Sequence, residues 1–250
     1  MKLIVLGAGY ATRLYPLTLN QPKPLLSVAG KPMIEHTLDY LSAIKEIDHV
    51  YIVTNAKFVH HFQQWVDKYR VDQSQLVFTV INDQSTDDAN KLGAIGDLHL
   101  VMTQEQINDD IILVAGDNLF SQPLSEFGEF ARQKNAPVLA VYDVGDLDKI
   151  KEYNAIEIDK FGQITFFEEK PAHPRSTLTG IALYYYPKFV LPLIQQYIEE
   201  GNNPDQPGRL VQWMYQRTPF YTWQVTGTWY DIGSKEMLEE ANRDFRKDQE

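Results

Sequence analysis

A glycine-rich turn with two cations close behind it opens the chain. Gly7 and Gly9 directly follow the apolar run 2–6, and Arg13 and Lys23 come soon after them. Glycines at the end of a buried strand let backbone N–H groups approach an anion closely, and fixed cations add attraction there. These residue types in this order predict a site for a phosphorylated ligand. An ordinary strand-to-helix corner is the alternative interpretation of the two glycines alone.

Two aspartates stand in apolar surroundings. Asp117 follows the apolar run 111–114, and ligand sites of open α/β sheets lie at the carboxyl ends of strands. Asp231 lies within the largely apolar segment 229–233, where a carboxylate is costly to bury unless something binds it. Two such carboxylates suit Mg²⁺, which uses one or two protein oxygens together with phosphate oxygens. A helix or turn cap is the alternative role for Asp117.

Other phosphate-binding motifs fit the N-terminal segment less well. Gly7 and Gly9 begin the dinucleotide fingerprint G-x-G-x-x-G, but Thr12 holds the third glycine position and no acidic residue ends a second strand about 20 residues on. Prolines within 16–24 also interrupt the helix that this fingerprint needs. No G-x-x-x-x-G-K-[ST] sequence occurs, which excludes a Walker loop. We therefore expect an extended loop over 12–26.

Strand and helix patterns alternate along the chain and must position these residues. The apolar patterns predict strands at 2–6, 49–54, 75–81, 111–114, 138–144, 155–158, 164–167 and 178–186. They predict helices at 33–44, 57–69, 92–103 and 234–246. Strands separated by helices favour a mostly parallel, doubly wound sheet, and the turn 160–163 predicts a hairpin.

Composition narrows the class of protein. With 250 residues, 44% of them apolar, the chain can bury one large α/β core. It has no run of 18 apolar residues and no basic region followed by an apolar signal core, so we expect a cytoplasmic protein with no membrane partner. Zero cysteines exclude disulfides, thiolate metal sites and cysteine nucleophiles, and a net charge of −11 argues against a nucleic-acid partner.

Several segments together resemble a known family. The first are 6–18 (LGAGYATRLYPLT), 22–26 (PKPLL) and 30–35 (GKPMIE). Further matches follow in family order at 114–118 (VAGDN), 168–171 (EEKP), 179–184 (TGIALY) and 227–233 (GTWYDIG). The chain thus resembles the nucleotide-sugar pyrophosphorylases, also called sugar-1-phosphate nucleotidyltransferases, over nearly its whole length, and among them glucose-1-phosphate thymidylyltransferases and related short members.

The resemblance implies a fold and a reaction. The fold is a Rossmann-like three-layer α/β/α domain with a predominantly parallel mixed sheet over 1–250. Residues 1–115 would be mainly the nucleotide-binding half, 116–233 mainly the sugar-phosphate and metal half, and 234–250 a C-terminal helix. In the reaction, a sugar 1-phosphate attacks the α-phosphorus of a nucleoside triphosphate and pyrophosphate leaves, with Mg²⁺ as cofactor. Homo-oligomers are possible on this resemblance.

The resemblance also assigns residue roles. It implies that the nucleotide is bound by Leu6, Gly7, Ala8, Gly9, Arg13, Lys23, Asn82, Gly93 and Asp117. Arg13, Lys23 and Asp117 would be catalytic, and Asp117 and Asp231 would hold the metal. The residues expected to bind the sugar phosphate are Asn154, Glu169, Lys170 and Gly180.

Three positions depart from the family pattern. Ala11 replaces a glycine and adds a methyl group where backbone meets phosphate. Asn154 also stands where relatives often carry glycine, and we expect its side chain to project toward the sugar. Asn82 and Asp83 occupy the position where thymidylyl enzymes carry a glutamine, and an asparagine can offer a pyrimidine the same donor and acceptor. We therefore expect UTP or dTTP as the nucleotide.

Three other functions stay open. One is a cytidylyltransferase that acts on another phosphomonoester such as phosphocholine. A second is a non-catalytic nucleotide-sugar sensor, which would be expected to have lost a metal aspartate or a loop cation. The third is a dinucleotide-dependent oxidoreductase, which the incomplete glycine fingerprint disfavours.

Overall fold

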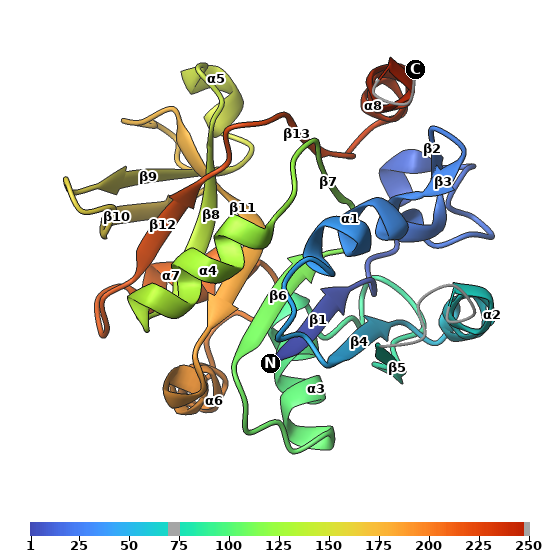
Figure 1. Ribbon diagram of the computed structural model, residues 1–250, viewed down its shortest axis with the longest axis horizontal. Coiled ribbons are helices and arrows are strands. Elements are labelled where there is room, and N and C mark those ends of the chain that lie inside the picture. The colour runs from blue at the N-terminus through green and yellow to red at the C-terminus, as the bar shows by residue number, and fades with distance from the viewer. Residues whose placement is uncertain (70–75, 248–250) are drawn as a thin grey trace. The chain divides into compact units, whose positions relative to one another are not determined.

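The structure, a computed structural model, describes residues 1–69 and 76–247. The chain forms two compact units, whose elements are labelled in Figure 1. Unit 1 consists of Met1–Lys91, Val114–Ser125 and Gly227–Glu250, and unit 2 of Leu92–Leu113 and Glu126–Thr226. Residue 75 of the expected third strand and residues 248–250 of the expected C-terminal helix lie outside the described residues.

Unit 1 is built on three parallel strands. They are β1 (Lys2–Leu6), β4 (His49–Thr54) and β5 (Val77–Asn82), in the order β1-β4-β5. Consecutive residues of β1 and β4 are buried, as expected for parallel strands covered on both faces. The helices of this unit are α1 (Met33–Leu41), α2 (Val59–Tyr69) and α8 (Lys235–Lys247).

The predicted loop of unit 1 is confirmed. Residues 12–26 contain two short 3-10 turns, η1 (Thr12–Leu14) and η2 (Lys23–Leu25), and no α-helix. The small hairpin β2 (Ser27–Val28) and β3 (Lys31–Pro32) follows. Apolar side chains from this loop, the hairpin, α1, α8 and the strand pair described next share one core: Leu14, Leu26, Val28, Met33, Leu119, Ile232, Leu238, Ala241 and Phe245.

Two segments far apart in the sequence pair within unit 1. β7 (Asn118–Phe120) runs antiparallel to β13 (Trp229–Asp231), with Asp231 opposite Asn118. Strand β6 (Ile111–Ala115) precedes β7, and its last two residues belong to unit 1. This pairing places the C-terminal segment beside residues 116–118 within unit 1.

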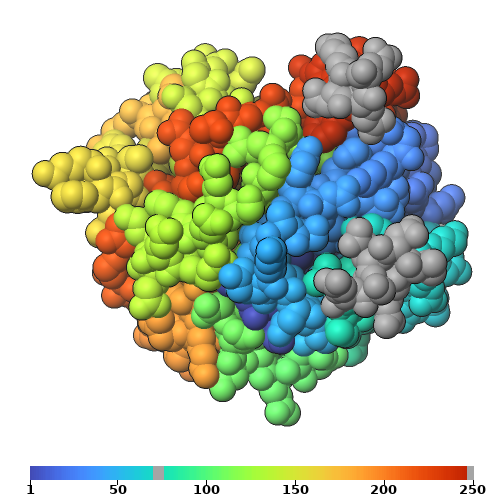
Figure 2. All heavy atoms as spheres, viewed as in Figure 1, coloured from blue at the N-terminus to red at the C-terminus, as the bar shows by residue number. Residues whose placement is uncertain are grey.

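Unit 2 contains a three-stranded arrangement and a separate hairpin. β8 (Val138–Asp143) lies between antiparallel β11 (Leu178–Tyr186) and parallel β12 (Tyr221–Gln224). The predicted hairpin is formed by β9 (Asn154–Ile158) and β10 (Ile164–Glu169), and its yellow tip projects from the surface in Figure 2. Phe161 in the turn is 65% exposed. The helices are α3 (Ala94–Gln104), α4 (Ser125–Lys134), α5 (Leu147–Ile150), α6 (Leu191–Glu199) and α7 (Pro207–Met214), with the 3-10 turn η3 (Lys188–Val190) before α6.

These elements confirm the predicted α/β class with a mixed, mostly parallel sheet. Strand 178–186 begins and ends where the sequence pattern predicts, and the other expected strands are found within a few residues of their predicted bounds. No helix of the described residues is long and apolar enough to cross a membrane.

Candidate functional site

Lys23 lies between the two aspartates that are expected to hold a metal. Its Nζ atom is 2.5 Å from Oδ2 of Asp117 and 3.9 Å from Oδ1 of Asp231. The Lys23 side chain is only 11% exposed, whereas those of Asp117 and Asp231 are 28% and 35% exposed. The three side chains therefore form one charged cluster that remains open to solvent on the carboxylate side, and all of them belong to unit 1.

Gly116 explains how Lys23 comes to lie against Asp117. Its N–H donates to the Leu6 carbonyl at 2.9 Å, which ties the turn before Asp117 to the end of β1. A Cβ atom at Gly116 would lie 2.9 Å from Cγ of Pro24 and 3.0 Å from the Leu6 oxygen, so no larger residue fits. Pro24 in turn fixes the backbone beside Lys23. Gly116 lies inside the matched family segment 114–118, but its need for space beside Pro24 could not be predicted from that segment alone.

Asp231 reaches the cluster through the β7–β13 pair. The Ile232 N–H donates to the Asp117 carbonyl at 3.5 Å, directly after the strand residue that pairs with Asn118. Burial, and then the negative charge of Asp117, raise the pKa of Asp231, while the charges of Lys23 and Arg13 oppose that rise. A carboxylate in this position is stabilised by any added positive charge.

Arg13 faces the same cluster. Its guanidinium lies 3.7–3.9 Å from the point where a Cβ atom of Gly233 would stand, so this glycine leaves room beside it. Within the part of the chain that the structure describes, Arg13 forms no ion pair, and its backbone belongs to the turn η1. The guanidinium is thus an exposed cation whose charge acts on Asp231, and it is available to an anionic ligand.

The cluster fits a divalent ion that is shared with phosphates. Among residues 1–69 and 76–247, no group of three or more His, Cys, Asp or Glu side chains is arranged to hold a metal. Two carboxylates suffice for Mg²⁺ when phosphate oxygens and water complete its coordination. Burial first, and then the charge of Asp117, raise the pKa of Asp231, so a bound cation would favour its ionised form. Asp117 and Asp231 are therefore chemically suited to the predicted metal.

The two glycines of the opening turn have different surroundings. The Gly7 N–H donates to the Val53 carbonyl at 2.8 Å, and a Cβ atom there would lie 3.1 Å from Cζ of Phe62. Gly7 is therefore needed for packing against β4 and α2, and its N–H is already used. A Cβ atom at Gly9 would meet nothing within 4 Å. Gly9 is therefore the exposed part of the turn that a ligand can approach, whereas Ala8 is buried and its carbonyl accepts a hydrogen bond from the Asn55 amide.

Ala11 adopts the left-handed backbone region, with φ 48° and ψ 45°. This conformation costs an alanine roughly 1–2 kcal/mol and a glycine almost nothing. Hydrogen bonds from the Thr18 hydroxyl and the Leu14 N–H to the Ala11 carbonyl hold the backbone in place. The family glycine that Ala11 replaces is thus explained by backbone conformation.

The segment after β5 is more ordered than its polar sequence indicates. Asn82 Oδ1 accepts the Gln84 N–H at 2.8 Å, so part of the amide expected to read the base is engaged. Asp83 is buried and accepts hydrogen bonds from the N–H and hydroxyl of Ser85, and burial raises its pKa.

Gly93 is the one expected nucleotide-binding residue that belongs to unit 2. It has φ +81°, and a Cβ atom there would lie 2.6 Å from the Cα of Asp205 and from the carbonyl oxygen of Pro204. The carbonyls of these two residues accept the N–H groups of Ala94 and Ile95 at the start of α3. Close packing against this segment, independent of any ligand, accounts for the glycine.

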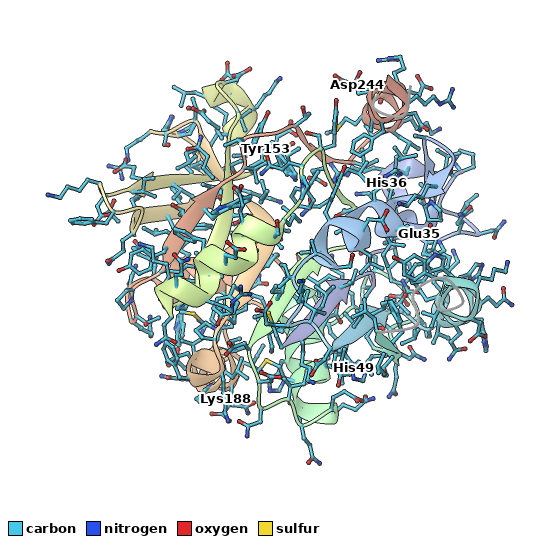
Figure 3. All side chains as sticks on the ribbon, viewed as in Figure 1. Glu35, His36, His49, Tyr153, Lys188 and Asp244 are labelled. Atoms are coloured by element: carbon cyan, nitrogen blue, oxygen red, sulfur yellow. The ribbon has the colours of Figure 1, made fainter. Side chains whose placement is uncertain are left out.

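The four residues expected to bind the sugar phosphate all lie in unit 2. Glu169 pairs with Asn154 in the β9–β10 register, and Asn154 hydrogen-bonds to Gly180 of β11. Lys170 follows Glu169 with φ +50°, and its N–H donates at 2.8 Å to the carbonyl of Tyr153, a residue labelled in Figure 3. The structure therefore brings these four residues together at one end of the hairpin.

Asn154 is engaged with the protein itself. Its Oδ1 accepts the Gly180 N–H at 2.6 Å and the Thr179 hydroxyl at 3.2 Å, and its Nδ2 donates to the Gly180 carbonyl at 3.2 Å. The residue is 8% exposed. Only one amide hydrogen remains for any other partner. The expected contact between Asn154 and the sugar therefore stays a prediction, to which the structure adds a role in fixing Gly180.

The carboxyl group of Glu169 differs from the amide of Asn154 in its hydrogen bonding. Its Oε2 atom is buried and has no hydrogen-bond partner within the described residues. Burial raises the pKa of this carboxyl to about 7, although the charges of Lys170 and Arg209 oppose the rise. An unpartnered buried acceptor costs free energy that a hydroxyl donor from a ligand can recover.

Comparison with known proteins identifies the family. A model of the nucleotidyl transferases matches residues 2–248. The chain belongs to the nucleotidyl transferase family. It is 29% identical over 187 residues to the UTP–glucose-1-phosphate uridylyltransferase AglF of Haloferax volcanii, covering 74% of this chain and 72% of that protein. The family match confirms the resemblance seen in the sequence.

Two further relatives define the extent of the likeness. The chain is 23% identical over 243 residues to the bifunctional protein GlmU of Methanocaldococcus jannaschii, covering 97% of this chain and 54% of that protein. It therefore spans about half the length of this relative. A solved Bacillus anthracis structure, assigned as a glucose-1-phosphate thymidylyltransferase in complex with a sucrose, matches with a TM-score of 0.83 and 25% identity, covering 98% of this chain and 95% of that one. This nucleotidyl transferase thus has the fold that its sequence predicts.

Proposed function

We propose that the chain joins a nucleoside triphosphate, with UTP or dTTP favoured, to a sugar 1-phosphate and releases pyrophosphate, with Mg²⁺ as cofactor. The observation that carries this proposal is the cluster in which Lys23 lies between Asp117 and Asp231, next to Arg13. Family membership and the names of relatives that use UTP and glucose 1-phosphate support the same reaction class.

The chemistry needs positioning and charge stabilisation more than a general base. The second pKa of a phosphate monoester is about 6, so the attacking phosphate is largely a dianion at neutral pH. Mg²⁺ held by Asp117 and Asp231 would neutralise phosphate charge. Lys23 would bind the α-phosphate and the incoming phosphate, and Arg13 would stabilise the departing pyrophosphate. The two roles given to side chains thus fall to Lys23 and Arg13, the cations of this cluster.

The sugar phosphate would be recognised by residues of unit 2. The buried Glu169 carboxyl offers an acceptor for a sugar hydroxyl. Gly180 would contribute close packing only, because Asn154 binds both of its backbone polar groups and a Cβ atom there would collide with Leu139. The Lys170 amino group forms no ion pair among the described residues and is available to a phosphate. Asn154 would act chiefly by holding Gly180 in place.

A pyrophosphate-release screen tests the proposal. Each of UTP, dTTP, CTP, ATP and GTP is incubated with the protein, Mg²⁺ and a panel of sugar 1-phosphates, with phosphocholine as a non-sugar acceptor. We expect release with UTP or dTTP and at least one sugar 1-phosphate, abolished by chelation of the metal. Release only with CTP and phosphocholine, or nucleotide-sugar binding without any release, would contradict the proposal in favour of the alternative transferase or a sensor.

A further inference from the structure

A glycine at the start of α7 requires an explanation. Gly208 is the second residue of this helix, is buried, and does not have a positive φ. Within a helix, glycine is less stable than alanine by up to about 1 kcal/mol, because it loses more backbone entropy on folding. Neither backbone conformation nor helix propensity therefore accounts for Gly208, and the cause must lie in what it touches.

The neighbour is the carboxyl group of Glu169. A Cβ atom at Gly208 would collide with Oε2 of Glu169 and would lie 3.1 Å from Cδ of the same side chain. It would also lie 3.2 Å from Cζ of Phe167, which closes the space from the side of β10. The carboxyl of Glu169 thus occupies the volume that an alanine side chain would need.

A second α7 residue holds the same glutamate by its backbone. Gln212 Oε1 accepts the Glu169 N–H at 3.1 Å. Gly208 and Gln212 are four residues apart, so they lie on one face of the helix. This face therefore determines both where the backbone of Glu169 ends its strand and where its carboxyl lies. The sequence motif around Glu169 gives no sign of this, because α7 comes nearly forty residues later.

The result is a carboxyl group kept in a fixed, partly desolvated position. Its Oε2 has no partner among the described residues, and the charges of Lys170 and Arg209 act on the carboxyl. A buried acceptor left unpaired costs about 1–3 kcal/mol, which a correctly placed hydroxyl recovers on binding. A site of this kind discriminates strongly against a ligand that lacks the hydroxyl.

We propose that Gly208 is a positioning residue for sugar recognition, which keeps the Glu169 carboxyl at the place where it accepts a hydroxyl of the sugar 1-phosphate. This inference rests on the proposed function. Alanine at position 208 would push the carboxyl away from that place. The Gly208–Gln212 face of α7 thereby becomes a determinant of sugar specificity that does not itself touch the nucleotide.

A double-mutant cycle on the full chain tests this role. Gly208→Ala, Glu169→Ala and the double variant are assayed with Mg²⁺, the preferred triphosphate and the preferred sugar 1-phosphate. Gly208→Ala should raise the KM for the sugar phosphate by about tenfold or more and leave the KM for the triphosphate within about twofold. In the Glu169→Ala background the same change should have almost no effect on either KM, because the group it displaces is gone.

Gly96→Ala is the matched control, because Gly96 lies in α3 of the same unit and a Cβ atom there would meet only carbons of Leu92 and Pro204. Its sugar-phosphate KM should equal that of the wild type. Equal effects of Gly208→Ala with and without Glu169, or an unchanged sugar-phosphate KM in an active enzyme, would overturn the inference alone. Absence of turnover by the wild type with every substrate pair would overturn the proposed function, and this inference with it.

Discussion

The side-chain amide of Asn154 binds both backbone polar groups of Gly180, accepting its N–H at 2.6 Å and donating to its carbonyl at 3.2 Å. The side chain of an asparagine thus makes the two hydrogen bonds that the backbone of a neighbouring strand makes in a β-sheet. Asn154→Ala should lower the free energy of unfolding by about 2 kcal/mol, because two partly buried backbone groups each lose a hydrogen bond. Denaturant titration measures this. Thr165→Ala, which removes one exposed hydrogen bond in the same hairpin, should change stability by less than about 1 kcal/mol, and a similar loss in both variants would contradict the argument.

Asp231→Asn should lower the catalytic activity but raise the stability of the folded protein. Asp231→Asn should reduce turnover by about 100-fold or more, because a main stabiliser of developing charge is lost. In the absence of metal it should raise the melting temperature at neutral pH, since burial and Asp117 already oppose the ionised form. Pyrophosphate release and thermal unfolding supply the two readouts, and Asp67→Asn on the exposed face of α2 is the control. Near-normal turnover in a folded Asp231→Asn protein would remove Asp231 from the site.

Arg13 should affect the chemical step more than substrate binding. Its guanidinium stands at the carboxylate cluster without an ion pair in the described chain, so Arg13→Ala should leave the fold intact. If the side chain stabilises departing pyrophosphate, turnover falls while the affinity for the triphosphate changes little. Single-turnover rates and equilibrium titration of the triphosphate separate the two quantities. A loss of affinity for the triphosphate with an unchanged single-turnover rate would indicate a role in ground-state binding only.

Lys170 should act on the other substrate. Its left-handed backbone and its exposed side chain are set by the turn after β10. Lys170→Ala should raise the apparent KM for the sugar phosphate, with little change in that for the triphosphate, because a phosphate-binding charge is removed. Steady-state kinetics with each substrate varied in turn gives the comparison. Unchanged sugar-phosphate kinetics would reduce the segment 168–171 to a solvated turn.

Glu169 should make stability depend on pH. Its pKa is raised from 4.5 to about 7, so between these values the folded protein binds more protons than the unfolded chain, and stability falls as pH rises. The shift corresponds to at most about 3 kcal/mol above pH 7. Glu169→Gln should therefore stabilise the protein more at pH 8 than at pH 5 in thermal unfolding. The exposed Glu129→Gln of α4 serves as control, and a pH-independent difference for Glu169→Gln would contradict the shifted pKa.

The sequence predicted local structure well and long-range contacts poorly. Strand 178–186 and the helix-free loop 12–26 follow from apolar runs and prolines, which act within a few residues. The direction of the Asn154 side chain depends on how β9 lies against β11, and no local pattern carries that information. The same is true of unit 1, where pairing of β13 with β7 joins residues more than a hundred positions apart.

In the candidate site, too, residues of matched segments could be predicted from the sequence, whereas contacts between distant elements could not. Residues within matched segments, such as Lys23, Asp117 and Asp231, are found close together. Gly208 was not predicted, because its importance lies in the space it leaves for a residue of another element. Gly7, by contrast, was expected to face a ligand, and its glycine is explained by Phe62 and Val53. A glycine in a sequence shows that space is needed but does not show what fills it.

The position of Lys23 has a thermodynamic consequence. If the proposed divalent ion is held by Asp117, the Lys23 ammonium group competes with it for the same carboxylate, so the lysine would lower the affinity of the empty enzyme for the ion. A bound triphosphate would give Lys23 another anion to bind and would release Asp117. Metal and nucleotide binding would then be linked with positive cooperativity, and by reciprocity each would raise the affinity for the other to the same extent.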